Sequence, residues 1–222
     1  MSSQPRLVEV RQNVLKQNDL LARSLRQRFK EAGVVVISLV SSPGAGKTML
    51  LEKTLTRLRE NGTRVAALVG DLATENDAAR LARSQAPVKQ IITGTVCHLD
   101  ADMVQRSLDE WKLDEYDCLF IENVGNLVCP SSYDLGENLR LVLMSVTEGE
   151  DKPLKYPTIF NTADVAVITK TDLVEAVEFD LNTARDNIQA VRPGIRILEV
   201  SAKTGVGMEE YWNFLEESKR PV

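Results

Sequence analysis

Residues 34–48 read VVVISLVSSPGAGKT, and this stretch decides the fold of the chain. Residues 34–40 are almost all apolar and predict a buried strand, and the small residues after them predict a loop that opens a helix at Gly46-Lys47-Thr48. In a P-loop, this order lets backbone N–H groups and the positive end of a helix dipole surround phosphate groups. The sequence therefore predicts a site for a phosphorylated nucleotide.

Single residues of this loop have separate expected roles. Lys47 supplies a mobile cation, and Thr48 places its hydroxyl on a Mg²⁺ that bridges the β- and γ-phosphates. The first glycine of the motif is replaced by Ser41, which we expect to be tolerated because the crowding beside the phosphates falls on the later glycines. The expected nucleotide contacts of the loop are Gly44, Ala45, Gly46, Lys47, Thr48 and Met49.

Length and composition bound the class of protein. The chain has 222 residues, 43% of them hydrophobic, which fits one α/β domain with a substantial core. No stretch is apolar enough to cross a bilayer, and the polar N-terminus has no apolar signal segment behind it, so we expect a cytoplasmic location without membrane contact. The net charge of −5 argues against a nucleic-acid surface. The three cysteines are expected to be free thiols or metal ligands.

Strand-like and helix-like segments alternate along the chain. The patterns predict strands at 34–40, 65–69, 88–92, 118–121, 139–146, 165–168 and 195–200. They predict helices at 6–30, 46–61, 74–82 (with Thr74 as the cap), 100–111, 179–191 and 208–219. Such alternation is typical of a mostly parallel sheet with helices on both faces. We expect a single P-loop NTPase domain over residues 33–222, preceded by a helical extension over residues 1–32. This extension is expected to pack on the domain, and the alternative is that it binds a partner.

Two carboxylates follow apolar strands at the edge of the sheet where ligands bind. Asp71 and Glu122 can each reach the Mg²⁺ directly or through water, and can orient an attacking water. Glu122-Asn123-Val124-Gly125 has the spacing of the Asp-x-x-Gly switch of GTPases, with Glu in place of Asp. The N–H of Gly125 can contact the γ-phosphate and release it on hydrolysis. We expect Lys47, Asp71 and Glu122 to be the catalytic residues.

The residues around Asp172 predict which base is bound. Asp172 can accept hydrogen bonds from N1–H and the 2-amino group of guanine, an edge that adenine lacks, and Lys170 can lay its stem along the base. Thr169 occupies the position usually held by Asn, so we expect one supporting hydrogen bond to be lost. The guanine O6 is expected to meet a backbone N–H of the run Ser201, Ala202 and Lys203. Because a site that pairs a polar edge rejects its rivals strongly, GTP is favoured over ATP.

Several longer runs resemble one family. They are SSPGAGKT at 41–48, GD at 70–71, NDAAR at 76–80, CHL at 97–99, IENVGNLVCP at 121–130 and VTEGEDKPLKYP at 146–157. Together they resemble the HypB family, the GTPases of hydrogenase nickel incorporation, over nearly everything from residue 34 onward. The resemblance implies a nickel-delivery GTPase that forms a nucleotide-dependent homodimer, with a metal site shared across the dimer and built from Cys97, His98 and Cys129. It implies two further partners: a hydrogenase nickel-delivery accessory protein and the hydrogenase large-subunit precursor.

The residues of this metal site carry a separate argument. Thiolate and imidazole ligands together suit Ni²⁺ or Zn²⁺. Because Cys97 and His98 are adjacent, we expect them to serve one ion poorly within a single chain, whereas two copies facing each other can supply a complete set. Cys129 lies shortly after the switch, so γ-phosphate contacts can move a ligand. The alternative is that Cys97 and Cys129 are small buried hydrophobic residues and that His98 has a structural role. A buried place in the core is what we expect for Cys118, which lies in an apolar strand.

The chain also departs from the family pattern. No Cys or His precedes Cys97, so we expect neither a high-affinity N-terminal nickel site nor a metal-storage role. A lysine of the segment 152–155 is a candidate to reach a γ-phosphate across the dimer. We expect slow hydrolysis because no arginine near the switch is evident in the sequence.

Two other functions stay open on the sequence alone. A urease nickel-insertion GTPase is the nearest alternative, although that class typically carries Cys-Pro-His rather than the adjacent Cys97-His98. The other alternative is a metal-binding scaffold that holds GTP only as a structural ligand.

Overall fold

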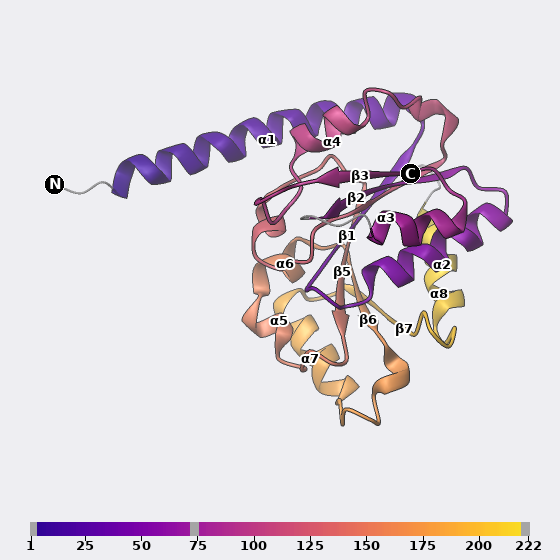
Figure 1. Cartoon of the computed structure of the whole chain (residues 1–222). Coiled ribbons are helices and arrows are strands. Elements are labelled where there is room, and N and C mark those ends of the chain that lie inside the picture. The colour runs from indigo at the N-terminus through magenta and orange to yellow at the C-terminus, as the bar shows by residue number, and fades with distance from the viewer. Residues whose placement is uncertain (1–3, 72–75, 219–222) are drawn as a thin grey trace.

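A computed structural model describes residues 4–71 and 76–218 of the chain. Within these residues, seven parallel strands form one sheet in the order β3-β2-β4-β1-β5-β6-β7 (Figure 1). The strands are β1 Val35–Ser41, β2 Val65–Asp71, β3 Val88–Ile92, β4 Cys118–Glu122, β5 Leu139–Ser145, β6 Val165–Thr169 and β7 Arg196–Val200. The predicted α/β fold with a mostly parallel sheet is therefore confirmed, and the sheet is parallel throughout.

Helices cover both faces of this sheet, as expected for strands that are apolar on both sides. They are α1 Gln4–Ala32, α2 Lys47–Glu60, α3 Asn76–Leu81, α4 Ala101–Ser107, α5 Lys152–Lys155, α6 Pro157–Thr162, α7 Leu181–Val191 and α8 Met208–Ser218. Short 3-10 turns occur at Ala82–Ser84, Leu113–Glu115, Cys129–Ser132 and Thr171–Leu173.

Alternation along the strands divides the core between the two faces, because successive side chains of a strand point to opposite sides. Ile37 and Leu39 of β1 pack with leucines of α2 and with Tyr211 of α8. Val36 points the other way, into a cluster with α1 and α4. A third cluster joins Val40 to α6 and α7 on that second face.

The central position of β1 places the predicted site. Leu39 of β1 pairs with Glu122 of β4, and Val69 of β2 pairs with the same glutamate. On the other side of β1, Ser41 pairs with Leu143 of β5. The strand ends that carry the P-loop and the switch are therefore neighbours in the sheet.

The helix α1 is longer than the predicted 6–30 and ends at Ala32, just before Gly33, whose φ of +70° favours glycine. There the N–H of Gly33 donates to the carbonyl of Lys30, and that of Val34 donates to Phe29. From Asn18 onward α1 has a buried face against the domain, and its N-terminal end extends beyond the sheet (Figure 1). The packing expected for this helix is thus observed over its second half.

Other boundaries differ from the sequence patterns. The helix predicted at 100–111 ends at Ser107, since the chain turns afterwards, with the N–H of Trp111 donating to the carbonyl of Leu108. Helices α5 and α6 were not predicted, because four and six residues are too few to set up a helical period. The predicted cap Thr74 lies outside the described residues.

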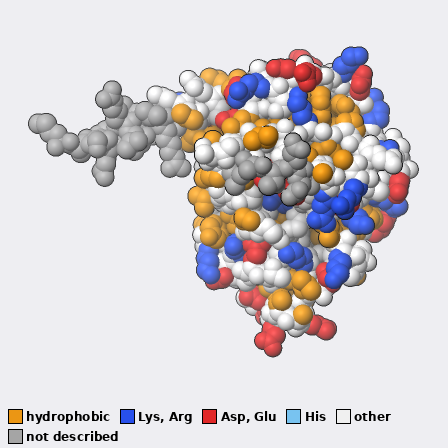
Figure 2. All heavy atoms as spheres, in the orientation of Figure 1, with side chains coloured by type: hydrophobic (Ala, Val, Ile, Leu, Met, Phe, Trp, Pro, Cys, Tyr) orange, Lys and Arg blue, Asp and Glu red, His pale blue; other side chains and the backbone are white. Residues whose placement is uncertain are grey.

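The surface seen in Figure 2 has acidic and basic side chains interspersed, in keeping with the modest net charge of −5. Among the described residues, no helix combines the length and apolar character that crossing a bilayer requires.

Candidate functional site

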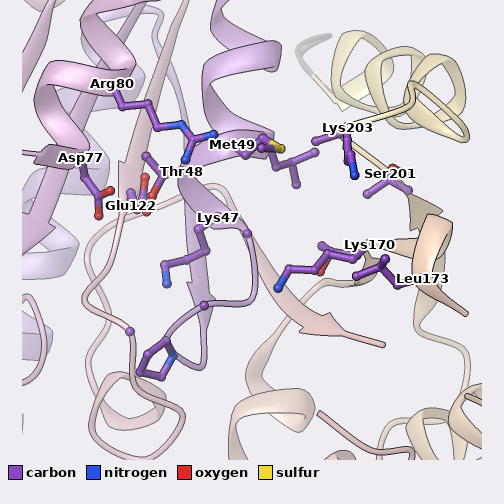
Figure 3. Close-up of a pocket in the computed structure, with 18 of the residues that line it drawn as sticks. Lys47, Thr48, Met49, Asp77, Arg80, Glu122, Lys170, Leu173, Ser201 and Lys203 are labelled. Carbon is purple, nitrogen blue, oxygen red and sulfur yellow. Dashed lines mark hydrogen bonds between the residues drawn. The ribbon is translucent and has the colours of Figure 1, made fainter. Parts of the chain in front are cut away.

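A cavity of about 660 Å³ lies at the carboxyl ends of the strands (Figure 3). Its lining comes from the P-loop, the ends of β2 and β4, helix α3, and the turns after β6 and β7. The sequence-predicted residues that line it are Gly44, Gly46, Lys47, Thr48, Met49, Asp71, Glu122, Gly125, Lys170, Asp172, Ser201, Ala202 and Lys203. Ala45 is the one predicted contact that does not line it, because its side chain is buried beneath the loop.

The P-loop holds its lysine through the residue that departs from the motif. The Nζ of Lys47 donates to the Oγ of Ser41 at 2.8 Å, and that hydroxyl in turn donates to the carbonyl of Ser42. Burial lowers the pKa of Lys47, and the nearby Glu122 and Asp77 oppose this shift. Ser41 is fully buried, so the serine that replaces the first glycine orients the lysine of the loop.

Thr48 and Glu122 meet at the inner end of the cavity. The Oγ1 of Thr48 donates to Oε1 of Glu122 at 2.7 Å, and Glu122 is only 2% exposed. Burial raises the pKa of Glu122 to about 7, against the opposing effects of Lys47 and of the Thr48 hydrogen bond. Its second carboxylate oxygen is buried without a hydrogen-bond partner among the described residues. This set of oxygen donors fits Mg²⁺, which prefers such ligands, and a cation beside Glu122 favours its charged form.

The base-binding end of the cavity is braced against the P-loop. The Oγ1 of Thr169 donates to the carbonyl of Ala45 at 2.6 Å, so this position keeps a hydrogen bond that we expected to be lost. Oδ1 of Asp172 accepts from the Oγ of Ser201 at 2.6 Å, which joins the two predicted base-reading turns. Lys170 has a φ of +59° and points along the cavity toward the P-loop (Figure 3).

Sequence reasoning missed two charged residues of the lining, Asp77 and Arg80 on α3. Nε of Arg80 lies 2.9 Å from Oε2 of Glu52, and Figure 3 shows its guanidinium close to Thr48 and Met49. An arginine therefore lines the same cavity as Glu122 and Gly125 of the switch. The sequence held a signal for this contribution, because Asp77 and Arg80 lie three residues apart on a short helix that follows the strand ending in Asp71.

The three candidate metal ligands converge in one chain. One ligand atom from each of Cys97, His98 and Cys129 lies within 4.8 Å of the others, and the two Sγ atoms are 3.0 Å apart. The sequence argument expected the adjacent pair to serve one ion poorly in a single chain. The structure brings Cys129, from the 3-10 turn after the switch, close to both of them in the same chain. Cys118 is fully buried in β4, in the core as expected.

The surroundings of His98 favour its neutral form. Its ring stacks on Tyr133 with centroids 3.9 Å apart, and its Nδ1 is buried without a hydrogen-bond partner among the described residues. Burial lowers the pKa of His98, and the nearby Asp100 opposes this. Neutral imidazole is the form that binds metal, so a borderline ion such as Ni²⁺ or Zn²⁺ fits this donor set.

Asn123 connects the metal cluster to the nucleotide cavity. This buried residue follows Glu122, and its Oδ1 accepts hydrogen bonds from the N–H of Leu99, at 3.0 Å, and of Val124. Leu99 follows His98 directly, so one side chain ties the metal loop to the switch. Two residues later the switch touches the P-loop, since a Cβ added at Gly125 would lie 2.9 Å from Cα of Pro43.

The lysines of the segment 152–155 differ in their surroundings. Nζ of Lys152 lies 3.2 Å from Oε2 of Glu148, and both side chains are largely buried. Lys155 pairs with Asp151 on the exposed side of α5. Lys155 is therefore the one with an exposed side chain.

Comparison with known proteins identifies the family. The model of the CobW/HypB/UreG nucleotide-binding domain matches residues 35–199. The hydrogenase maturation factor HypB of Escherichia coli (strain K12) is 46% identical over 217 residues, covering 98% of this chain and 74% of that protein. The hydrogenase/urease maturation factor HypB of Helicobacter pylori (strain ATCC 700392 / 26695) is 41% identical, covering 96% of this chain and 88% of that protein.

Solved structures agree with these sequence matches. The crystal structure of HypB from Helicobacter pylori in complex with nickel has a TM-score of 0.87 at 42% identity, covering 92% of this chain and 95% of that one. HypB from Archaeoglobus fulgidus has a TM-score of 0.86 at 40% identity, with 92% and 100% covered. The chain belongs to the CobW/HypB/UreG family of nucleotide-binding GTPases and, within it, to the HypB hydrogenase maturation factors.

Proposed function

We propose that this chain hydrolyses GTP with Mg²⁺ and delivers Ni²⁺ to the [NiFe]-hydrogenase large-subunit precursor, together with a nickel-delivery accessory protein. In this proposal the nucleotide state controls both dimerisation and the metal site. The observation that carries it is a buried link between the two sites: Asn123 joins the loop of His98 to the switch that follows Glu122.

The cavity residues divide the work on GTP. Lys47 binds the phosphates, and Thr48, Glu122 and Asp71 hold the Mg²⁺, which neutralises charge on the phosphates when bound. Glu122 and Asp71 also orient the water that attacks the γ-phosphorus. The bond from the γ-phosphorus to the bridging oxygen breaks, and GDP, the leaving group, remains with its β-phosphate in the P-loop. Gly44, Gly46 and Met49 offer backbone N–H groups to the phosphates.

At the other end of the cavity, the proposed reader of guanine is Asp172, fixed by Ser201. Lys170 covers the base, and the backbone of Ala202 and Lys203 meets O6. Ala45 supports the loop from beneath through its bond to Thr169. The support for this assignment is that all these residues except Ala45 line one cavity.

At the metal cluster, Cys97, His98 and Cys129 are the proposed ligands of Ni²⁺, which is cargo, with Zn²⁺ as the competing ion. The γ-phosphate lies between the P-loop and Gly125 in this scheme, and its loss lets the switch move. The motion reaches one ligand loop through Asn123 and the other through the short stretch of chain from Gly125 to Cys129. Nickel in the complex of the Helicobacter pylori relative supports the choice of metal.

Dimerisation is proposed through the face that carries both sites. Val128, next to Cys129, is 62% exposed, although it is a large apolar residue. A two-fold contact there brings two ligand sets together. Lys155, with its exposed side chain, is then the better candidate than Lys152 to reach a γ-phosphate of the second copy.

Turnover measurements test the nucleotide half of the proposal. Phosphate release is followed with GTP and with ATP, each with and without Ni²⁺, alongside the oligomeric state. We expect release with GTP at a slow rate and none above background with ATP. Asp172→Asn should shift the preference from GTP toward XTP, because an amide N–H suits the 2-oxo group of xanthine. Background rates with GTP for the wild type would refute the enzymatic reading and favour the scaffold.

Nickel binding and hydrogenase maturation test the other half. Cys97→Ala and His98→Ala should each remove Ni²⁺ binding at the cluster and block maturation, while GDP binding stays intact. Cys118→Ala is the matched control, since it removes a thiol from the core of β4. Unchanged nickel binding and maturation in the first two variants would contradict the metal assignment.

A further inference from the structure

The helix α1 is fastened to both loops that carry the proposed metal ligands, through one buried side chain. Nδ2 of Asn18 donates to the carbonyl of Asp134 at 2.9 Å. Its Oδ1 accepts from the N–H of Ala101, also at 2.9 Å. Ala101 is three residues after His98, and Asp134 is five residues after Cys129. A single amide therefore bridges the two ligand loops from outside the sheet.

Further contacts hold the loop after Cys129 on the same helix. Nη2 of Arg26 donates to both carboxylate oxygens of Asp134, at 2.7 and 2.9 Å. At Gly136 the loop approaches α1 so closely that an added Cβ would lie 2.9 Å from the carbonyl oxygen of Ala22. Leu135 is buried among residues of α1 and of the loop after His98.

The bridged loops meet again at the ligands. Tyr133, next to Asp134, stacks on the ring of His98, so the loop from Cys129 supports the histidine of the other loop. The two residues after this tyrosine are held by α1, and its own carbonyl accepts a hydrogen bond from Nη2 of Arg140 at 2.7 Å. A helix far away in the sequence thus contributes to the support of the cluster.

We propose that Asn18 is a positioning residue of the metal site. It touches neither ligand nor metal and acts by keeping the two ligand loops in register. The proposal rests on the proposed function, since it takes Cys97, His98 and Cys129 as the metal ligands. Asn18 is 5% exposed, so water does not readily replace its bonds, and removing it leaves the buried N–H of Ala101 unpaired. Residues that orient ligands from outside the coordination sphere commonly contribute about 10–100-fold to metal affinity.

The experiment compares Asn18→Ala with Asn13→Ala in the full chain, loaded with Ni²⁺. Asn13 lies on the same helix and is exposed, which makes it the matched control. Affinity is measured by competition with a chromophoric chelator, and geometry by the thiolate-to-nickel absorption in the near ultraviolet. We expect Asn18→Ala to bind Ni²⁺ about 10-fold more weakly or worse, with an altered absorption band. Asn13→Ala should match the wild type, and both should bind GDP as the wild type does.

A purely structural role is separated by a third variant. Phe29→Leu loosens α1 at a buried position about three helical turns beyond Asn18. If Phe29→Leu weakens Ni²⁺ binding as much as Asn18→Ala does, or if Asn18→Ala binds like the wild type, the positioning role is overturned. Asn18→Asp, which keeps the acceptor for Ala101 and loses the donor to Asp134, gives the same test if the alanine variant fails to fold.

The two proposals fail in different ways. If Cys97→Ala and His98→Ala bind Ni²⁺ as the wild type does, the metal assignment is wrong, and the role of Asn18 falls with it. If those variants lose Ni²⁺ and Asn18→Ala does not, only the positioning role is wrong.

Discussion

The nucleotide cavity and the metal cluster are neighbours, but they are built in different ways. In the cavity, the decisive side chains follow parallel strands within a few residues, so the sheet itself brings them together: Thr48 after β1, Glu122 at the end of β4 and Asp172 after β6. In the metal cluster, the proposed ligands lie on two loops, and contacts with Asn123, Tyr133 and α1 support these loops. Asn18 binds groups 83 and 116 residues away in the sequence.

This difference predicts how each site responds to change. A cavity positioned by a buried sheet is stiff, because its supports are the strongest part of the fold. A cluster positioned by loop and helix contacts is open to adjustment by a few residues. Substitutions in one site should therefore leave the other intact, except at the turn from Glu122 to Gly125 that connects them.

The largest expected effect comes from the P-loop cation. Lys47→Ala should reduce the rate of GTP hydrolysis about 10³-fold, because it removes a preorganised charge from a buried site. Ni²⁺ affinity of the nucleotide-free protein should stay within twofold of the wild type. Phosphate release and chelator competition are the two measurements, and Lys53→Ala, an exposed lysine of the same helix, is the control. Loss of nickel binding in Lys47→Ala would break the separation of the two sites.

The next effect tests the connecting turn. In Gly125→Ala the new methyl would press on the backbone of Pro43, so the switch or the P-loop must shift. A displacement of about 1 Å near the reacting groups costs about 10²-fold in rate, which is the expected loss of hydrolysis. The change in Ni²⁺ affinity between the GDP and GTP states should vanish as well. If that response survives at its full size while hydrolysis falls, the turn is not the route of coupling.

Much of the cavity could be read from the sequence, for a physical reason. A strand that is apolar on both faces, followed by a polar residue, predicts a side chain at the ligand edge of a parallel sheet. Asp71, Glu122 and Asp172 all follow that rule. Arg80 does not follow it, because it lies on the short helix α3 and not at the end of a strand.

The metal cluster shows where such reading stops. The residue types of Cys97, His98 and Cys129 indicate a metal, but nothing in their spacing tells that one chain brings them within 4.8 Å. Asn18 looks like any polar residue of an amphipathic helix, and its two bonds depend on loops that no local pattern describes. Thr169 is a similar case, since its partner Ala45 lies 124 residues away.

A smaller effect is expected where α1 meets the ligand loop. Gly136 and Gly194 have nearly the same φ, +80° and +81°, but only Gly136 is crowded. Alanine at either position has a strain of about 1–2 kcal/mol, and Gly136→Ala should lose roughly 1–2 kcal/mol more through overpacking. Denaturant unfolding measures this difference. Gly136→Ala should also bind Ni²⁺ more weakly than Gly194→Ala, while GDP affinity is the same in both. Equal nickel affinity would mean that the approach of α1 does not set the cluster.

The smallest effect concerns the brace beneath the P-loop. Thr169→Val keeps the shape of the side chain but leaves the carbonyl of Ala45 without its donor, which costs about 1 kcal/mol, or roughly fivefold in GDP affinity. Thr158→Val, on an exposed position of α6, is the control. Titration with a fluorescent GDP analogue gives the affinity, and Ni²⁺ binding should not change. Because the threonine bond supports the loop rather than the ligand, saturated turnover should stay near the wild-type rate. A fall in turnover with unchanged affinity would instead show that Thr169 acts on the phosphate end of the cavity, where the reaction takes place. Its contact with Ala45, 124 residues away in the sequence, would then serve the reaction and not the binding of GDP.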